Sequence, residues 1–372
     1  MQLITGTYSS GTRIDRDVHI GVVGSGDLEV LLTSPSEPGT TTVRVRTSVD
    51  GFDTTWRRVL DRFFESNDIA CDVEINDFGA TPGMVSVRLS QAFDLASHED
   101  ASSAADPTRG SDGMPFTELT ARQRAAAILD PGTWREILGP SDHVESSHLE
   151  PQGIVPAADD GAVIARGTID GTPAAVVALE GRFQGGGIGE VSGAKIAAVL
   201  ERALVDAEAG QPVKVVLLLE TGGIRLQEAN LGLLAIAEIH AGIVALQRHT
   251  PVTAVIAGMV GCFGGMGIAA GLCDHIVMTR AGRLSLNGPE VIETEAGIEE
   301  FNSSDRGTVW AVTGGEHRVN TGRADDLVAD TADAVRDAVI ACGTDPATVH
   351  RADKVDDLLA ELADTTTERT AR

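Results

Sequence analysis

The hydrophobic pattern of the first 96 residues predicts a small α+β domain. Two short apolar runs, at 18–23 and 28–32, flank the sequence from Gly24 to Asp27, which predicts a β-hairpin with a tight turn. Further strands are expected at 43–49, 73–75 and 84–89. One segment, 54–65, has helical spacing instead and predicts a helix lying on the sheet through Trp56, Val59, Leu60, Phe63 and Phe64.

Residues 97–113 interrupt this pattern because they contain almost no large apolar side chain. They are rich in Ser, Ala, Asp and Gly, a composition typical of a flexible linker. The sequence therefore predicts two domains, at 1–96 and 114–372, joined by this linker.

Strand-like and helix-like runs alternate in the second domain. A capped helix is predicted at 117–129, and two strands at 162–167 and 174–179 are joined through Asp170-Gly171. The predicted elements that follow are helix 192–209, strand 213–219, helix 228–247, strands 252–256, 275–279 and 283–286, and helices after Pro289 and at 332–340 and 354–362. The repeated order of strand, strand and helix predicts an α/β domain of stacked ββα units rather than a doubly wound sheet.

The segment 251–273 organises this second domain. It carries no charged residue and is long enough to resemble a membrane span, but glycines divide it into a strand, a turn and a short helix. A second glycine cluster, at 181–189, also precedes a helix. Backbone N–H groups gather at such helix openings, and glycine lets a substrate oxygen approach them.

Together the two clusters predict an oxyanion hole built from backbone amides. Two such turns offer paired N–H donors to the charge that develops when a thioester forms an enolate. The candidate catalytic residues are Gly186 and Gly187 in the first cluster and Gly264 and Gly265 in the second. Tight packing in a buried core is the alternative interpretation of these glycines.

Net charge and the numbers of lysines and cysteines argue against several classes of function. The formal net charge is −26 and only three lysines occur, which disfavours nucleic acid and anionic membranes as partners. Four scattered cysteines indicate neither a zinc site nor a disulfide framework, and no metal is expected. No signal peptide is recognised, so a cytoplasmic location is expected.

Several single residues and motifs favour a structural role over a catalytic one. The glycines at 21–26 have the wrong order for a dinucleotide loop, and Ser192 lies one position late for a nucleophile elbow, so we expect it to cap a helix. His240 is expected to be a satisfied core histidine and Cys262 a small buried filler. Glu190 is interpreted as an anion at a helix start.

Longer segments resemble a known family. Residues 117–343 resemble the beta subunit of biotin-independent malonate decarboxylase, which implies a crotonase-like, carboxyltransferase-type fold. The segments that carry the resemblance are FQGGGIGEVSGAKI (183–196), ETGGIRLQEANLGLLAIAEIH (220–240), IAGMVGCFGGMG (256–267) and LNGPEVIETEAG (286–297).

Residues 1–96 resemble the delta subunit of the same enzyme, its acyl carrier protein. The resemblance rests on VGSGDLEV (23–30) and DFGATPG (77–83). It implies that Ser25 carries a covalent phosphoribosyl-dephospho-coenzyme A. The two subunits are usually separate chains, whereas here the linker joins them, which raises the effective concentration of the acyl arm if the linker reaches.

The resemblance implies a malonyl-thioester decarboxylase that releases CO2 and leaves an acetyl thioester. It also implies three partners: a gamma subunit that completes the active site, an acyl-carrier transferase (alpha) subunit, and a prosthetic-group transferase. Two alternatives remain open, a biotin-dependent carboxyltransferase subunit and a non-catalytic carrier and docking subunit. No lysine follows a methionine as a biotin carrier requires, so no biotin is expected.

Overall fold

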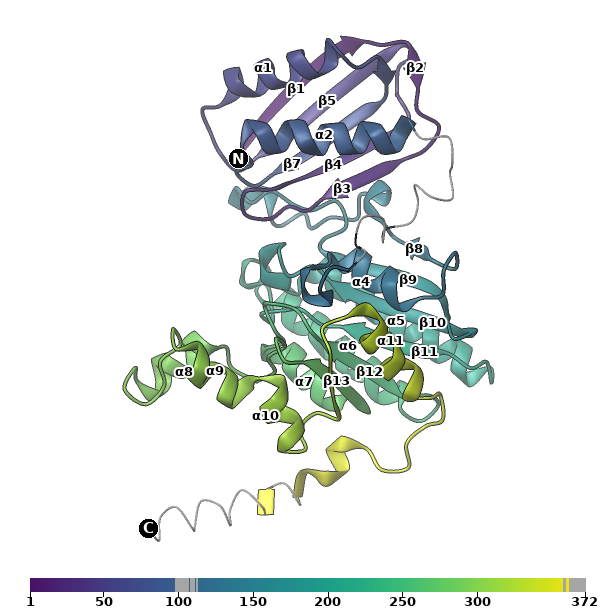
Figure 1. Cartoon of the computed structure of the whole chain (residues 1–372), viewed down its shortest axis with the longest axis vertical. Coiled ribbons are helices and arrows are strands. Elements are labelled where there is room, and N and C mark those ends of the chain that lie inside the picture. The colour runs from purple at the N-terminus through teal and green to yellow at the C-terminus, as the bar shows by residue number, and fades with distance from the viewer. Residues whose placement is uncertain (98–106, 108–110, 112, 357–358, 361–372) are drawn as a thin grey trace.

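The structure, a computed structural model, describes residues 1–97, 107, 111, 113–356 and 359–360. The predicted linker lies largely outside these residues, and the predicted helix at 354–362 lies partly outside them. Two sheets of five and seven strands form the cores of an N-terminal and a C-terminal domain, which are stacked along the long axis of the molecule (Figure 1). None of the helices in the described part of the chain has the length and hydropathy that a bilayer crossing demands.

The N-terminal domain is a mixed sheet with two helices on one face (Figure 1). The strand order is β1-β5-β7-β4-β3, and the predicted hairpin is formed by β3 and β4, with Val18 opposite Leu32. The strands are β1 (Gln2–Ser9), β3 (Val18–Gly21), β4 (Leu28–Thr33), β5 (Thr40–Thr47) and β7 (Asp72–Asp77); the helices are α1 (Asp53–Phe64) and α2 (Pro82–Ser97); β2 (Thr12–Arg13) and β6 (Ile69–Ala70) form a separate pair.

The predicted strand at 84–89 is wrong, because these residues belong to α2. Pro82 occupies the first position of the helix, where its missing N–H costs nothing. Val85, Leu89, Ala92 and Phe93 then recur at helical spacing and pack into the core of the sheet. The run at 84–89 was too short for its periodicity to distinguish the two structures. Strand β1 was not predicted at all.

The C-terminal domain has a seven-stranded sheet whose order follows the chain, β14-β13-β12-β11-β10-β9-β8. Strands β10 to β14 are parallel, and β8 to β10 are antiparallel. The strands are β8 (Arg135–Ile137), β9 (Ala162–Ile169), β10 (Thr172–Leu179), β11 (Lys214–Leu218), β12 (Val252–Ile256), β13 (His275–Thr279) and β14 (Asp326–Val328). Each connection between consecutive parallel strands, from β10 to β14, leads to the next strand on the same side of the sheet order. Right-handed connections in one direction place their helices on one face of the sheet.

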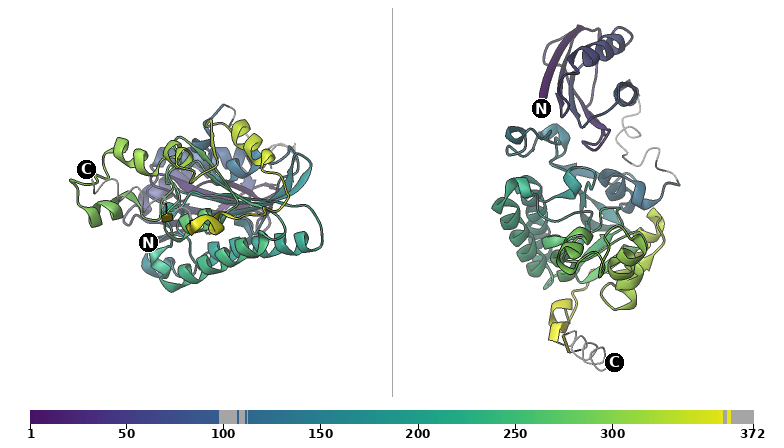
Figure 2. Two further views of the ribbon diagram at one scale, coloured as in Figure 1. Left: turned by 90° about the horizontal axis from the view of Figure 1, so that it is seen from below. Right: turned by 90° about the vertical axis from the view of Figure 1, so that its left-hand side faces the viewer.

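Helices cover both faces of this sheet (Figure 2). Residues of α5, α6 and α7 pack on one face with Val215 and Leu217 of β11, whereas α4 and α11 pack on the other with Val216 and Leu218. Alternate residues of one strand thus enter two different cores. The helices are α4 (Ala121–Ile128), α5 (Glu190–Glu208), α6 (Asn230–Leu246), α7 (Gly264–Leu272), α8 (Pro289–Ala296), α9 (Arg306–Thr313), α10 (Gly315–Asn320) and α11 (Ala332–Ala341).

Short 3-10 turns and isolated bridges complete the domain. The predicted capped helix begins at Ala121, where Thr120 and Gln123 form a capping box. The predicted strand at 283–286 is reduced to single bridges, from Arg283 to Gly314 and from Leu284 to Cys262. The 3-10 turns are η1 (Phe116–Glu118), η2 (Pro140–Asp142), η3 (Glu150–Gln152), η4 (Gln184–Gly186), η5 (Leu226–Glu228) and η6 (Arg351–Lys354).

The two domains contact each other through a small apolar cluster and two buried polar groups. The cluster contains Val22 and Val23 from the hairpin and Leu149, Val155, Ala157 and Phe183 from the C-terminal domain. Glu29 accepts the backbone N–H of Ala158 at 3.0 Å. Arg46 donates to both carboxylate oxygens of Glu145, at 2.6 and 2.9 Å, a geometry that fixes direction as well as distance. The hairpin therefore lies at the domain interface.

Candidate functional site

The first glycine cluster forms a tight turn, η4, immediately before α5. Gly185 and Gly186 both have positive φ, of 63° and 64°, which favours glycine. A Cβ on Gly186 would lie 1.9 Å from the carbonyl oxygen of Glu220, whereas a Cβ on Gly185 would meet nothing within 4 Å. The close approach of two backbones is thus the reason for glycine at position 186.

The second cluster opens α7. Gly264 has a φ of 60° and is the first residue of the helix, with Phe263 as its N-cap. No side chain among the described residues caps this end, so the first N–H groups of the helix are left for other acceptors. The positive end of the helix dipole adds to their attraction for an anion.

The two clusters are joined through the segment 221–223. The N–H of Gly222 donates to the carbonyl oxygen of Gly185 at 2.8 Å. On its other side, a Cβ on Gly264 would lie 3.2 Å from the Cα of Gly223, and Thr221 forms a bridge with Cys262. The structure therefore brings together two turns that are about 80 residues apart in the sequence.

Most amides of the predicted site already have acceptors. The N–H of Gly186 donates to Phe183, that of Gly187 to Gln184 and that of Gly264 to Leu286, at 2.9, 3.1 and 2.7 Å. In the described part of the chain, the N–H of Gly265 has no acceptor, and neither does that of Gly185. Each cluster thus leaves at least one amide uncommitted beside the predicted residues: Gly265 in the second cluster, and Gly185, the neighbour of Gly186, in the first.

A buried ion-pair cluster supports the first turn. Arg225 donates to Asp160 at 2.6 Å and to Glu228 at 2.7 Å, and it also holds the carbonyl oxygen of Gly187 at 3.1 Å. All three side chains are at most 1% exposed. Burial raises the pKa of Asp160; burial alone would also raise the pKa of Glu228, but the backbone N–H of Glu190 and the charge of Arg225 lower it on balance.

A second buried pair, Arg124 with Glu220, supports the strand end between the clusters. Glu220 also accepts the N–H of Val260 at 3.1 Å. A Cβ on Gly181 or Gly258 would come within 2.5 Å of the Glu220 side chain, so these two glycines make room for it. Sequence analysis did not identify either ion pair, because the partners lie 65 and 96 residues apart. Among the described residues, no group of His, Cys, Asp and Glu has a metal-binding arrangement.

The single residues for which the sequence favours a structural role have structural partners. The ring of His240 bonds to the carbonyl oxygen of Gly265 at 2.8 Å, which makes it a support of the second cluster. Cys262 is fully buried, and burial raises the pKa of its thiol. Ser192 is not the cap: Gly189 is, and it donates its N–H to the Ser192 hydroxyl. Glu190 is the first residue of α5, as expected for a helix-start anion, and it bonds to His148.

Ser25 lies at the tip of the β3–β4 hairpin. It is exposed, and within the described residues its hydroxyl has no hydrogen-bond partner. The preceding Gly24 packs against the C-terminal domain, where a Cβ would lie 3.1 Å from the Cβ of Arg182. Arg182 is two residues before η4. The hairpin tip and the first glycine cluster are therefore neighbours across the domain interface.

Comparison with known proteins gives a consistent result for both halves. Residues 15–96 match the acyl carrier family described as malonate decarboxylase delta subunit (MdcD), and residues 114–364 match the carboxyl transferase domain. The second match covers more than half of the 372 residues. The chain belongs to the carboxyl transferase family.

Relatives and solved structures place this carboxyl transferase among the malonate decarboxylases. A Pseudomonas malonate decarboxylase hetero-tetramer contains a chain that is 58% identical, with a TM-score of 0.66, over 67% of this chain and 91% of its own length. The Pseudomonas MdcD–MdcE hetero-dimer matches at 52% identity, with a TM-score of 0.57, over 67% and 96%. The chain is thus a malonate decarboxylase component with an acyl carrier domain and a carboxyl transferase domain.

Curated relatives match the two domains separately. The malonate decarboxylase acyl carrier protein of Pseudomonas fluorescens is 49% identical over 81 residues, which is 22% of this chain and 81% of that protein. The malonyl-S-ACP:biotin-protein carboxyltransferase MADC of Malonomonas rubra is 44% identical over 236 residues, 61% of this chain and 74% of that protein. The two relatives therefore account for different parts of this chain.

Proposed function

We propose that this chain presents a malonyl thioester on its N-terminal domain and decarboxylates it on its C-terminal domain. In this reaction the bond between the α-carbon and the carboxylate breaks, CO2 leaves, and the electron pair forms an enolate. A proton delivered to the α-carbon then gives the acetyl thioester. The observation that carries the proposal is that segment 221–223 joins two amide-bearing turns, Gly185–Gly187 and Gly264–Gly265, in a chain that also exposes Ser25 next to the first of them.

The backbone amides of the two turns are proposed to hold the thioester oxygen. The N–H of Gly265 is supported as one donor because it has no acceptor within the described residues and lies at a helix opening. The turn containing Gly186 and Gly187 supplies the second donor through the adjacent Gly185, whose N–H also has no acceptor within the described residues. These donors stabilise the enolate oxygen more than the neutral thioester oxygen, which is the requirement for catalysis. One such donor typically lowers the activation barrier by about 3–4 kcal/mol.

Ser25 is proposed to carry the phosphoribosyl-dephospho-coenzyme A, attached by a prosthetic-group transferase. Its exposed and unpartnered hydroxyl fits covalent modification. The group supplies a thiol on a long arm. A separate acyl-carrier transferase subunit would exchange acetyl for malonyl on this arm between turnovers.

A gamma subunit is proposed to cover the site. Large apolar side chains near both clusters are exposed, among them Leu226, Met259 and Leu286, which are 78%, 52% and 59% exposed. Exposed apolar side chains gathered around a site are typical of a protein interface. The carboxylates Glu220 and Glu228 are engaged in buried ion pairs. We therefore assign the proton donor to the facing subunit.

The decisive experiment supplies the purified chain and gamma subunit with a malonyl thioester and measures CO2 release. Two variants at one position isolate the amide. Both Gly265→Ala and Gly265→Pro introduce a Cβ that contacts the Ile236 side chain, but only proline also removes the backbone N–H. We expect Gly265→Pro to release CO2 about 10²–10³-fold more slowly than Gly265→Ala. No CO2 release from the wild-type complex would refute the catalytic assignment.

Mass spectrometry of the chain from its own host tests the carrier half. We expect added mass on the peptide containing Ser25, and an unmodified peptide would contradict the proposal. The name of the Malonomonas relative favours the alternative of a biotin-dependent reaction. Adding avidin, which sequesters biotin, to the decarboxylation assay distinguishes that alternative from the biotin-independent reaction. CO2 release that continues with avidin present supports the biotin-independent reaction. The non-catalytic alternative predicts no effect of Gly265→Pro.

A further inference from the structure

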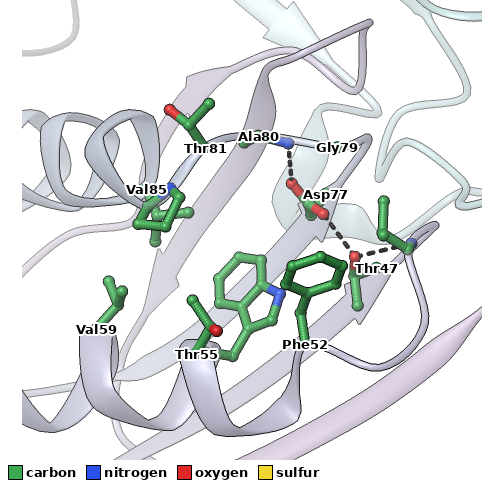
Figure 3. Close-up of a pocket in the computed structure, with 12 residues that line it drawn as sticks. Thr47, Phe52, Thr55, Val59, Asp77, Gly79, Ala80, Thr81 and Val85 are labelled. Atoms are coloured by element: carbon green, nitrogen blue, oxygen red, sulfur yellow. Dashed lines mark hydrogen bonds between the residues drawn. The ribbon is translucent and has the colours of Figure 1, made fainter.

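The N-terminal domain contains a pocket of about 280 Å³ that the proposed reaction does not use (Figure 3). It lies between the first turns of α1 and α2, at the end of the sheet where Thr47 of β5 pairs with Asp77 of β7. Its size is near the lower limit of pockets that hold drug-sized ligands, about 300–1,000 Å³. It can therefore accommodate a ring system rather than a complete coenzyme arm.

The walls of the pocket are aromatic and aliphatic. Phe52, which is 52% exposed, lines the pocket (Figure 3), and the buried Trp56 lines it as well. The other apolar lining residues are Val49, which is also exposed, Val59, Ala80, Pro82 and Val85. Flat aromatic surfaces of this kind favour stacking with a planar ligand.

One side of the pocket is polar. Asp77 is 2% exposed; one of its carboxylate oxygens accepts the N–H of Ala80 at 2.8 Å and the other accepts the hydroxyl of Thr47 at 2.6 Å. The Thr47 hydroxyl in turn accepts the N–H of Val49 at 3.1 Å. With a backbone hydrogen bond from Gly79 as well, three of the roughly four acceptor positions of the carboxylate are filled, so this edge suits a ligand that donates one N–H. An anionic ligand is disfavoured beside the carboxylate.

The pocket is adjacent to the serine that we propose is modified. The loop that lines it, at 79–82, follows Phe78, whose backbone is bonded in both directions to the hairpin: Gly26 donates to Phe78 at 3.0 Å, and Phe78 donates to Asp27 at 3.1 Å. Leu28, three residues after Ser25, is also paired with Asp77. The pocket and Ser25 therefore occupy the same end of the sheet.

We propose that this pocket binds the purine base of the arm attached to Ser25. The inference rests on the proposed modification of Ser25 by a dephospho-coenzyme A derivative. In such a group the adenosine is next to the phosphoribosyl attachment, so the base is held close to the serine. A purine is planar and bears N–H donors, which matches the aromatic walls and Asp77. The malonyl end carries a carboxylate and is remote from the attachment, so it matches neither feature. Docking of the base would hold the near part of the arm on the carrier and leave the thiol end free to reach the catalytic domain.

Fluorine NMR of the full-length chain labelled with 5-fluorotryptophan tests this proposal. The chain has three tryptophans, and the Trp56→Phe variant assigns the resonance of Trp56. We expect loading of Ser25 to shift the Trp56 resonance in the wild type. In the unmodified chain, free adenosine at millimolar concentration is expected to shift Trp56 and to leave Trp134 and Trp310 unchanged.

Two matched variants on one helix separate the pocket from the surface. Thr55 lines the pocket and Thr54 does not, yet both are exposed in the first turn of α1. We expect Thr55→Arg to abolish both shifts by filling the pocket, and Thr54→Arg to leave them intact. Because both positions are exposed, both variants are expected to fold.

Three outcomes would overturn the inference. One is a chain with the added mass on Ser25 but an unshifted Trp56 resonance. Another is a shift that persists in Thr55→Arg. The third is a shift that changes when the thiol is malonylated, which would place the acyl end in the pocket. If Ser25 gains no mass, the carrier proposal fails on its own, and the adenosine titration still decides whether the pocket binds a purine: a specific shift of Trp56 supports this, and no shift refutes it.

Discussion

Replacing Gly186 with alanine tests the arrangement of the first glycine cluster, and Gly185 provides a matched control. The two residues have φ values of 64° and 63°, so alanine at either position incurs the same left-handed backbone cost, about 1–2 kcal/mol. Only at Gly186 does the new Cβ meet backbone, 1.9 Å from the Glu220 carbonyl oxygen and 2.9 Å from its carbon. The backbones must separate by about 1 Å, and such overpacking costs about a further 1–3 kcal/mol.

Differential scanning calorimetry of the C-terminal domain transition measures this difference. For a domain of this size, 1 kcal/mol shifts Tm by about 2–4 °C, so we expect Gly186→Ala to melt about 2–12 °C below Gly185→Ala. A shift of about 1 Å would also displace the segment 221–223 and with it the second cluster. We therefore expect the kcat/KM for the malonyl thioester to fall about 10²-fold in Gly186→Ala. Equal melting of the two variants would refute the close approach of Gly186 to Glu220.

Two further predictions concern ionisable groups. Arg225→Met leaves Asp160 and Glu228 buried without their cation and should destabilise the domain by about 3–5 kcal/mol. Arg202→Met should cost at most about 1 kcal/mol, because the Arg202 side chain is 67% exposed and its partner Asp206 keeps a second ion pair with Arg166. Thermal unfolding compares the two variants, and equal losses would contradict the buried cluster. A hydrogen bond to Cys342 and another to Asp326 raise the pKa of His275 from 6.5 to about 9. The protonated ring thus stabilises the folded chain fully below pH 6.5, and this contribution is lost as pH rises through 9. Melting curves should show this loss in the wild type and a flatter profile in His275→Gln; identical profiles would contradict the assignment.

Local patterns were sufficient for most of the elements. Helix α1 was predictable because Trp56, Leu60 and Phe64 recur at helical spacing, and the β3–β4 hairpin because two apolar runs flank a glycine-containing turn. Helix α2 was mistaken for a strand over 84–89, since six residues do not separate a period of 2 from one of 3.6. The resemblance to malonate decarboxylase also rested on contiguous segments, and the comparisons with known proteins confirm it.

The sequence by itself determined where the chain turns into helices with glycine at the turn, which residues face a core, and the family to which both halves belong. Tertiary structure alone decided which amides have acceptors: the Gly264 N–H donates to Leu286, and the Gly265 N–H has no acceptor among the residues that the structure describes. It also decided that Arg225 joins Asp160, 65 residues away, and that the hairpin with Ser25 lies against Arg182. The physical reason is the separation along the chain of the residues that interact. Turn and helix preferences depend on neighbours only a few residues away. Hydrogen-bond acceptors and buried charges, in contrast, are supplied by distant segments that only the folded chain brings together.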